Sequence, residues 1–304
     1  MHQGCEISII TVNYNGLKDT CELIDSIPSN ESSLEVIVVD NHSDGSDALQ
    51  IQRRYPNVNV IRSEQNLGFA GGNNLGIDEA KGKYIFLINN DTIFKGSNEE
   101  KMAALRSMCL RLETPNVGVV CPKIRFSWGS KAIQFAGYTP LSKITIRNHS
   151  IGFGEEDRGQ YEMAHPTPYA HGAAMMLKRE VIEQAGLMPE NYFLYYEEID
   201  WSFIIRRAGF EIWYDPCCEI FHKESQSTGQ DSPTKTYYIT RNRLVLVSRN
   251  LSWPSNWLSY LYLIMLAAPK NYLKFLFKGQ KKQARSTARG VYDFLTGKQG
   301  KRNI

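Results

Sequence analysis

The chain has 304 residues, of which 42% are hydrophobic and 22% charged, so it contains ample material for the core of a folded, soluble protein. Its six cysteines form no CxxC pair, and the adjacent Cys217 and Cys218 suit neither a zinc site nor a usual disulfide. We therefore expect reduced, buried thiols, as in a cytosolic protein. The N-terminus lacks a basic n-region and runs directly into a strand pattern, so we expect no signal peptide.

The net charge of +3 conceals a strong asymmetry along the chain. Residues 235–304 hold fourteen Lys/Arg and one acid, Asp293, which gives this segment a charge of +13. The remaining residues hold 35 − 14 = 21 basic and 32 − 1 = 31 acidic side chains, for a charge of −10. This division suggests that the basic C-terminal segment faces something anionic.

The first 122 residues alternate between apolar strands and helical patterns. We expect strands over 6–14, 34–40, 57–63, 83–89 and 116–122, and helices over 17–27, 46–53 and 70–80. Strands that alternate with helices favour a parallel sheet whose faces are covered. Ligands of such sheets bind at the carboxyl ends of the strands, so the polar residues that follow each strand are candidates for a site.

Beyond residue 122 the pattern weakens into short strands and loops until about residue 170. We then expect a strand over 169–179, helices over 180–185 and 197–209, and a strand over 210–216. The polar, turn-rich stretch 224–235 is the expected boundary between a domain of residues 1–225 and a C-terminal segment of residues 226–304.

The C-terminal segment has a helical pattern. Its apolar run over 256–269 is shorter than the ~20 residues needed to span a bilayer. Basic residues then recur every three or four positions, which predicts one basic side of a helix with aromatic residues between: Lys270, Lys274, Lys278, Lys281, Arg285 and Arg289. This pattern indicates an amphipathic helix on an anionic membrane surface. The alternative is a helix packed on the domain with a solvated basic face, and no nucleic-acid-binding motif accompanies the charge.

Polar side chains follow three of the expected strands. Asp91, preceded by Asn89 and Asn90, is suited to hold a hard divalent cation that bridges a diphosphate, and the two amides can hold sugar hydroxyls. The alternative is an Asx turn that caps the strand. Asp40 is placed for a ribose or base edge, and Tyr14 offers an aromatic face for a base. Their alternatives are helix capping and plain packing.

A second acidic cluster, "YYEEIDW", places Glu197, Glu198 and Asp200 in the first turn of the expected helix 197–209. The helix dipole favours acids there, which is the structural explanation. Three acids so close would also repel one another, so that one could have a pKa raised toward the range of a general base. His222 follows the strand 210–216 and could return to the same pocket.

Together these motifs resemble an inverting glycosyltransferase of family 2. The resemblance covers residues 6–225, where "ITVNYNG", "VVDNHSDGS", "NLGFAGGNNLGI", "NND" and "YEEIDW" follow in the family's order, with "NND" in the place of its D-x-D motif. It implies the GT-A fold, an α/β fold with a Rossmann-like, mainly parallel sheet and helices on both faces. The nucleotide-binding half would be residues 1–122 and the acceptor half residues 123–225. The closest resemblance is to bacterial rhamnosyltransferase-like members.

The resemblance also implies a role for each matching residue. The nucleotide would be held by Val12, Tyr14, Asn15, Asp40, Asn66, Asn73 and Asn90. Asp91 and His222 would hold Mn²⁺ or Mg²⁺. Glu198 would be the catalytic base, with Asp200 as the alternative. His171 and Trp201 would lie on the acceptor side, and the alternative for Trp201 is a place in the core.

The implied reaction transfers a sugar from a nucleotide-sugar donor to a hydroxyl of a growing, lipid-linked surface polysaccharide. Likeness to the rhamnosyltransferases suggests L-rhamnose from dTDP-rhamnose. The enzyme would work in the cytoplasm, associated peripherally with the inner face of the cell membrane. Two alternatives are a catalytically degenerate scaffold that binds nucleotide sugars, and a sugar nucleotidyltransferase. The second would need a glycine- and basic-rich loop after the first strand, and "NYNGLKD" is not such a loop.

Overall fold

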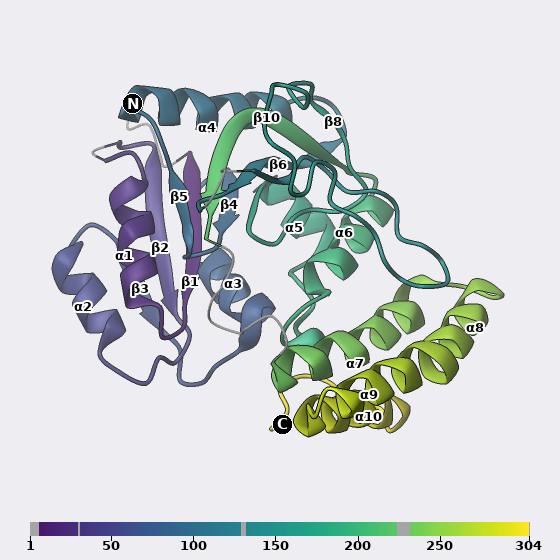
Figure 1. Ribbon diagram of the computed structural model, residues 1–304. Helices are drawn as coiled ribbons and strands as arrows, with labels where there is room; N and C mark the ends of the chain where they lie inside the picture. The colour runs from purple at the N-terminus through teal and green to yellow at the C-terminus, as the bar shows by residue number, and fades with distance from the viewer. Residues whose placement is uncertain (1–5, 30, 129–131, 224–231, 304) are drawn as a thin grey trace.

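A single mixed sheet runs through the molecule. The computed structural model describes residues 6–29, 31–128, 132–223 and 232–303. The strand order is β3-β2-β1-β4-β9-β6-β10-β5, with β7 paired to β6 and β8 paired to β10 (Figure 1). The predicted α/β architecture is therefore confirmed.

The N-terminal part of the sheet is parallel. It consists of β1 (Ile7–Asn13), β2 (Leu34–Asp40), β3 (Asn59–Arg62) and β4 (Tyr84–Ile88). The crossovers are α1 (Leu17–Ser26), α2 (Asp47–Arg54) and α3 (Gly68–Glu79), as the sequence predicts. The centre of this sheet is covered on both faces, which explains the nearly unbroken apolar runs of β1 and β4. Asn13 and Asp40, the last residues of β1 and β2, pair side by side at the carboxyl edge.

The second part of the sheet is mixed. Antiparallel β9 (Ala174–Lys178) lies between β4 and β6 (Val117–Phe126), and β10 (Glu211–His222) runs parallel to β6. The short strands are β5 (Thr92–Phe94), β7 (Ile133–Phe135) and β8 (His165–Pro166). The helices are α4 (Asn98–Leu112), α5 (Arg179–Ala185) and α6 (Glu197–Arg207), with a 3₁₀ turn at Glu190–Tyr192.

Several features of this part differ from the sequence prediction. β10 does not end at residue 216, because an irregularity between Asp215 and Glu219 lets the strand pass Pro216 and pair again up to His222. β5 and α4 were not predicted, although a capping box formed by Ser97 and Glu100 starts α4. Of the described cysteines, four are buried free thiols as expected, whereas Cys217 is exposed.

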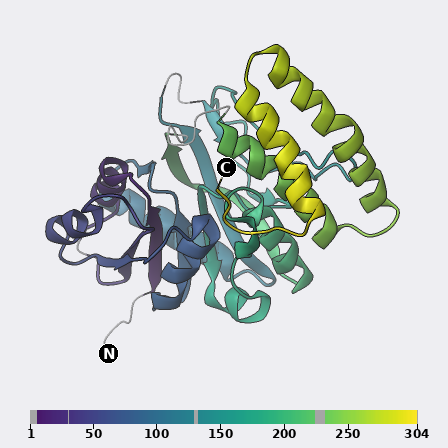
Figure 2. The same cartoon turned by 90° about the horizontal axis from the view of Figure 1, so that it is seen from below.

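The C-terminal segment forms a layer of helices. These are α7 (Pro233–Asn250), α8 (Ser255–Tyr260), a π-helical stretch (Leu261–Ala267), α9 (Ala268–Phe277) and α10 (Lys281–Leu295). The prediction of one continuous basic helix over 270–289 is wrong, because Gly279, with φ +70°, ends α9 and lets α10 fold back along α9 and α7 (Figure 2). Most of the expected boundary at 224–235 lies outside the described residues, and α7 begins at its end.

This helical layer packs on the sheet-bearing body. A hydrophobic cluster joins Tyr192 and Ile199 of the body to Leu244 and Leu263 of the C-terminal helices. Beside it, the guanidinium Nε of Arg249 in α7 lies 2.6 Å from a carboxylate oxygen of the fully buried Asp200 in α6. The C-terminal helices are therefore attached through both apolar and ionic contacts.

We predict that Arg249→Met costs about 3 kcal/mol of unfolding free energy, because it leaves the buried Asp200 carboxylate without its cation. The matched control is Arg54→Met, which breaks the exposed pair with Asp25 and should cost less than about 1 kcal/mol. Urea unfolding of both variants measures the difference. Equal losses would mean that the Asp200–Arg249 pair has no special structural role.

Candidate active site

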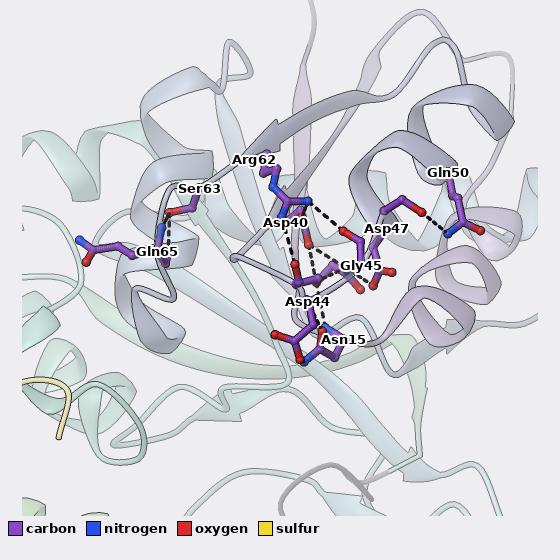
Figure 3. A network of polar contacts seen from close by, with 12 residues as sticks. Asn15, Asp40, Asp44, Gly45, Asp47, Gln50, Arg62, Ser63 and Gln65 are labelled. Carbon is purple, nitrogen blue, oxygen red and sulfur yellow. Dashed lines mark hydrogen bonds and ion pairs between the residues drawn. The ribbon is translucent and has the colours of Figure 1, made fainter. Parts of the chain in front are cut away.

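The carboxyl edge of the parallel strands gathers a polar network around Asp40. Asp40 is fully buried, and one of its oxygens accepts a hydrogen bond from Asn13 Nδ2 at 3.1 Å and another from the Ser43 hydroxyl. Its other oxygen lies 3.2 Å from the guanidinium of Arg62 (Figure 3). The carboxylate predicted to bind the nucleotide is thus held rigidly at the end of β2.

Asn13 lies in the polar cluster predicted after the first strand but has no predicted role, and Arg62 was missed by the sequence analysis. Asn13 also donates to Asp47 at 3.1 Å and accepts from the hydroxyl of Thr20 at 2.8 Å. Arg62 donates to the carbonyls of Ser43 and Gly45, which shapes the loop after β2. Register would have revealed Arg62, because it ends β3 directly opposite Asp40 in the neighbouring parallel strand.

The loop after β1 presents the other predicted nucleotide contacts. Tyr14 is 48% exposed and follows the strand directly, so its ring is accessible to a base. Asn15 adopts a left-handed backbone conformation, and its side chain exchanges hydrogen bonds of 2.9 and 2.8 Å with Asp44. Val12 is half-buried and lies against Gly72 of α3. Tyr14 is therefore exposed at this edge, whereas the side chain of Asn15 is used to brace the loop.

The start of α3 is held by asparagines. Asn66 accepts hydrogen bonds from the backbone of Gly68 at 2.9 Å and from Asn41 at 3.3 Å. Asn73 is buried and donates to the carbonyl of Phe69 within its own helix. Asn66 and Asn73, both predicted to contact the nucleotide, therefore have hydrogen-bond partners within the protein. The amide NH₂ of Asn73 is used by the carbonyl of Phe69 and does not point to a ligand.

Asp91 and His222 meet as predicted. Asp91 Oδ1 lies 3.1 Å from His222 Nε2, and both side chains are largely buried. His222 Nδ1 lies 2.8 Å from the amide oxygen of Gln134, to which it donates, and this contact orients Nε2 toward Asp91. Nε2 is buried and has no hydrogen-bond donor among the described residues. An imidazole nitrogen and a carboxylate oxygen at 3.1 Å form an ion pair when the ring is protonated, and they are a fitting pair of ligands for a divalent cation when Nε2 is unprotonated.

This pair would be an incomplete cage by itself. Among the described residues no group of three His, Cys, Asp or Glu side chains converges on one point. Asn90 lies next to Asp91, and its amide donates to the Thr20 hydroxyl at 3.0 Å. A cation held by Asp91 and His222 would therefore need oxygens from its ligand, which is how Mg²⁺ and Mn²⁺ are bound together with phosphates.

Glu198 occupies the first turn of α6 as predicted. Burial raises its pKa to about 7, although hydrogen bonds from backbone N–H groups at the start of the helix oppose the shift. Burial, followed by the charge of Glu198, also raises the pKa of Glu197. Beside the carboxyl lies Gly172, where an added Cβ would stand 3.7 Å from Glu198 Cγ. The absence of a side chain at Gly172 leaves room next to the carboxyl.

His171 lies between the Glu198 region and the Asp91–His222 pair in the chain of contacts. It precedes Gly172, and its ring stacks on Tyr138 at a centroid distance of 5.7 Å and an angle of 10°. Burial, and secondarily the charge of His222, lowers its pKa to about 3. The backbone N–H of Ala173 donates to Nδ1 at 3.1 Å, which puts the proton of the neutral ring on Nε2. His171 is thus a neutral hydrogen-bond donor close to both His222 and the neighbour of Glu198.

The loop before Glu198 is strained and clamped. Phe193, Tyr195 and Tyr196 have φ values of 70°, 68° and 77°, a region that costs non-glycine residues about 1–3 kcal/mol each. Asn242 of α7 donates to the carbonyls of residues 192, 194 and 195 at 3.1, 2.7 and 2.9 Å. Arg241 donates to the first of these at 2.7 Å. Sequence analysis missed both residues, which act through the loop that places Glu198.

Two predicted site residues turn out to be structural. Asp200 was predicted as the alternative base, but it is fully buried and paired with Arg249 and with the amide of Asn250 at 2.5 Å. Trp201 was predicted on the acceptor side, but it is 1% exposed and donates to the carbonyl of Gly186 at 3.0 Å. Neither side chain reaches the space beside Glu198, so both predictions are corrected.

Comparison with solved structures agrees with the fold. GalNAc-T7, solved with UDP, GalNAc and Mn²⁺, superposes with a TM-score of 0.66 at 14% identity, over 98% of this chain and 59% of that one. The mannosyltransferase PcManGT of Pyrobaculum calidifontis, solved with GDP-Man and Mn²⁺, gives 0.57 at 15% identity, over 97% and 88% of the two chains. At these identities the likeness establishes the GT-A fold.

Sequence comparison identifies the family. A hexosyltransferase of low-salt glycan biosynthesis, Agl10 of Haloferax volcanii, is 27% identical over 301 residues, 97% of this chain and 92% of that protein. An N-acetylglucosaminyl-diphospho-decaprenol L-rhamnosyltransferase of Mycobacterium tuberculosis is 25% identical over 222 residues, 66% and 70% of the two chains. The model of glycosyl transferase family 2 matches residues 8–186, more than half of the chain. The protein therefore belongs to glycosyl transferase family 2 and transfers a sugar from a nucleotide-sugar donor.

Proposed function

We propose that the protein is a metal-dependent, inverting glycosyltransferase. Its acceptor is a hydroxyl of a growing, lipid-linked surface polysaccharide, and its donor is dTDP-L-rhamnose. The observation that carries the proposal is the meeting of Asp91 and His222 at the strand ends, together with Glu198 beside Gly172, the residue that follows His171. The printed names of the glycan hexosyltransferase and the rhamnosyltransferase support the choice of acceptor and sugar.

Glu198 acts as the general base of a single displacement. Its raised pKa makes it a stronger proton acceptor than an exposed carboxylate, and the space beside Gly172 admits the acceptor. The carboxylate takes the proton of the acceptor hydroxyl while that oxygen attacks the anomeric carbon. Because the leaving group departs on the opposite side, the configuration at this carbon is inverted.

Asp91 and His222 hold the cation, and His222 is oriented for this by Gln134. A bound Mn²⁺ or Mg²⁺ neutralises charge that grows on the departing nucleoside diphosphate. An imidazole ligand suits Mn²⁺ better than Mg²⁺. Tyr14 offers its exposed ring to the base at the edge of β1 and β2, where the buried Asp40 orders the loop that receives the nucleoside. The neutral His171 donates from Nε2 toward the transferred sugar.

We predict that Glu198→Gln lowers the rate of sugar transfer about 10²–10⁴-fold, because the amide cannot accept the hydroxyl proton. Donor binding should stay unchanged, since the carboxyl contacts the acceptor. The matched control is Glu180→Gln, an exposed carboxyl on α5, which should transfer at the wild-type rate. The measurement is initial transfer rate together with the donor dissociation constant. Near-wild-type transfer by Glu198→Gln would disprove the base assignment.

We predict that kcat/KM declines as the pH falls through about 7, because burial raises the pKa of Glu198 to that value and only the carboxylate is a base. The pKa of Glu197 is raised as well, by burial and secondarily by the charge of Glu198, so the acid side of the pH–rate profile reports both carboxyls together. The same shift makes the folded state bind more protons than the unfolded state between about pH 4.5 and 7, so this contribution lowers stability as the pH rises through that window. The measurement is the pH dependence of kcat/KM, and a decline that begins only near the pKa of an exposed glutamate would contradict the role of burial.

We predict that dTDP with Mn²⁺ raises the midpoint of thermal unfolding by about 5 °C at a hundredfold excess over Kd, because only the folded state binds. UDP, GDP and CDP serve as comparisons, each with and without the metal. His222→Ala should lose the Mn²⁺-dependent part of the shift, while the exposed His149→Ala keeps it. A wild-type protein that responds to none of the nucleotides would overturn the donor site.

A further inference from the structure

One long helix at the outside of the molecule exposes a stripe of apolar side chains. α8, the π-helical stretch and α9 run without a break from residue 255 to residue 277, and Figure 2 shows this helix as an outer edge of the C-terminal layer. Ten large apolar residues on it or just before it are more than one third exposed: Trp253, Trp257, Leu258, Leu261, Met265, Leu266, Tyr272, Leu273, Leu276 and Phe277. Such a patch marks an interaction surface.

The opposite side of this helix is fixed to the protein. Leu263 and Phe275 are buried, and Leu263 belongs to the hydrophobic cluster that includes Leu244 of α7. The buried hydroxyl of Ser259 donates to the carbonyl of Lys143 at 2.5 Å. None of the described helices is long and apolar enough to cross a membrane. The exposed stripe is therefore one face of an anchored helix, which can lie on a surface without leaving the fold.

The charge around the stripe selects the kind of surface. From residue 233 to residue 292 the chain contains eleven Lys/Arg and no Asp or Glu. Those on α9, in the turn after it and at the start of α10 are exposed: Lys270, Lys274, Lys278, Lys281, Lys282 and Arg285. A second copy of the chain seated on this face would bring equal positive charges together, with no acid on the helix to offset them. An anionic lipid surface satisfies both the apolar stripe and its basic border.

We propose that the helix 255–277 is a membrane-docking face whose occupant is an anionic lipid bilayer. The apolar stripe enters the interfacial region, with Trp253, Trp257 and Tyr272 at the depth that aromatic side chains prefer, and the lysines contact the headgroups. α7 and the part of α10 after its basic first turns stay on the protein side. The proposal deepens the proposed function, on which it rests for the lipid-linked acceptor, because docking holds the active site near the membrane that carries this substrate.

The test is flotation of the full chain with vesicles of phosphatidylcholine, with and without about 30 mol% of the anionic lipid phosphatidylglycerol. We predict that the wild type floats with the anionic vesicles and not with the neutral ones. The triple variant Trp257→Ser/Leu261→Ser/Met265→Ser should float no better than protein without vesicles. Its matched control changes three exposed apolar residues elsewhere, Leu49→Ser/Leu110→Ser/Met163→Ser, and should float as the wild type does.

A second pair of variants tests the charge. Lys270→Gln/Lys274→Gln should weaken binding to anionic vesicles about 25-fold, at roughly 5-fold for each lysine near the surface. Lys18→Gln/Lys81→Gln, two exposed lysines of the body, should leave binding unchanged. Equal weakening by both pairs would mean that overall charge, and not this helix, attracts the protein, and would overturn the proposal.

Three further outcomes are decisive. No flotation of the wild type, or full flotation of the apolar triple variant, would overturn the docking face. If the wild type sediments as a dimer without lipid and the triple variant sediments as a monomer, the exposed face binds a second copy of the chain and the membrane proposal is overturned. The nucleotide-dependent thermal shift needs no membrane and should persist in the triple variant. Failure of docking with that shift intact leaves the glycosyltransfer proposal standing, whereas loss of the shift in the wild type is a failure of the donor site.

Discussion

Three backbone carbonyls in the loop before α6 accept hydrogen bonds from a single buried side chain, the amide of Asn242. The loop needs these bonds because Phe193, Tyr195 and Tyr196 all have positive φ angles, which are unfavourable for residues other than glycine. α6 begins at Glu197, directly after the third of them. The direction from which Glu198 enters the site is therefore set by a helix that follows it far along the chain. The loop is held from its other side as well, where the carbonyl of Phe193 accepts the N–H of Phe69.

The same carbonyl explains why α3 starts with glycine. Gly68 has φ +77°, and a Cβ at this position would stand 2.2 Å from the oxygen of Phe193. The loop before Glu198 is thus trapped between the start of α3, which belongs to the nucleotide half, and α7, which belongs to the C-terminal segment. The division of the chain near residue 225 stays a prediction, but the contacts of α7 make this helix a structural part of the candidate active site. The C-terminal helical layer then has two sides, because α7 contacts the loop before Glu198 while the 255–277 helix faces outward.

Sequence reasoning succeeded where the pattern is local. Continuous apolar runs predicted β1, β2 and β4, and the residues at their ends led directly to Asp40 and Asp91. α4 was within reach, since its capping box is visible as Ser97 followed by Glu100. Asp200 was not, because its partner Arg249 lies on another helix and only the folded chain brings the two together. β10 was cut short because proline normally ends pairing, and the irregularity that lets it continue has no sequence signature.

Charge explains why the site needs a cation of its own under the proposed mechanism. The chain before residue 235 carries a charge of −10, and acids such as Asp44 and Asp47 surround Asp40 at the very edge where a nucleoside diphosphate would bind. Arg62 contacts Asp40 and the carbonyls of the loop after β2, so its positive charge offsets the charge of Asp40 and not that of a bound diphosphate. A diphosphate in these surroundings would be repelled unless a divalent ion accompanied it. With asparagine replacing the first acid of the motif, Asp91 would supply a single carboxylate to that ion, and His222 would add a ligand that brings no further negative charge to the edge.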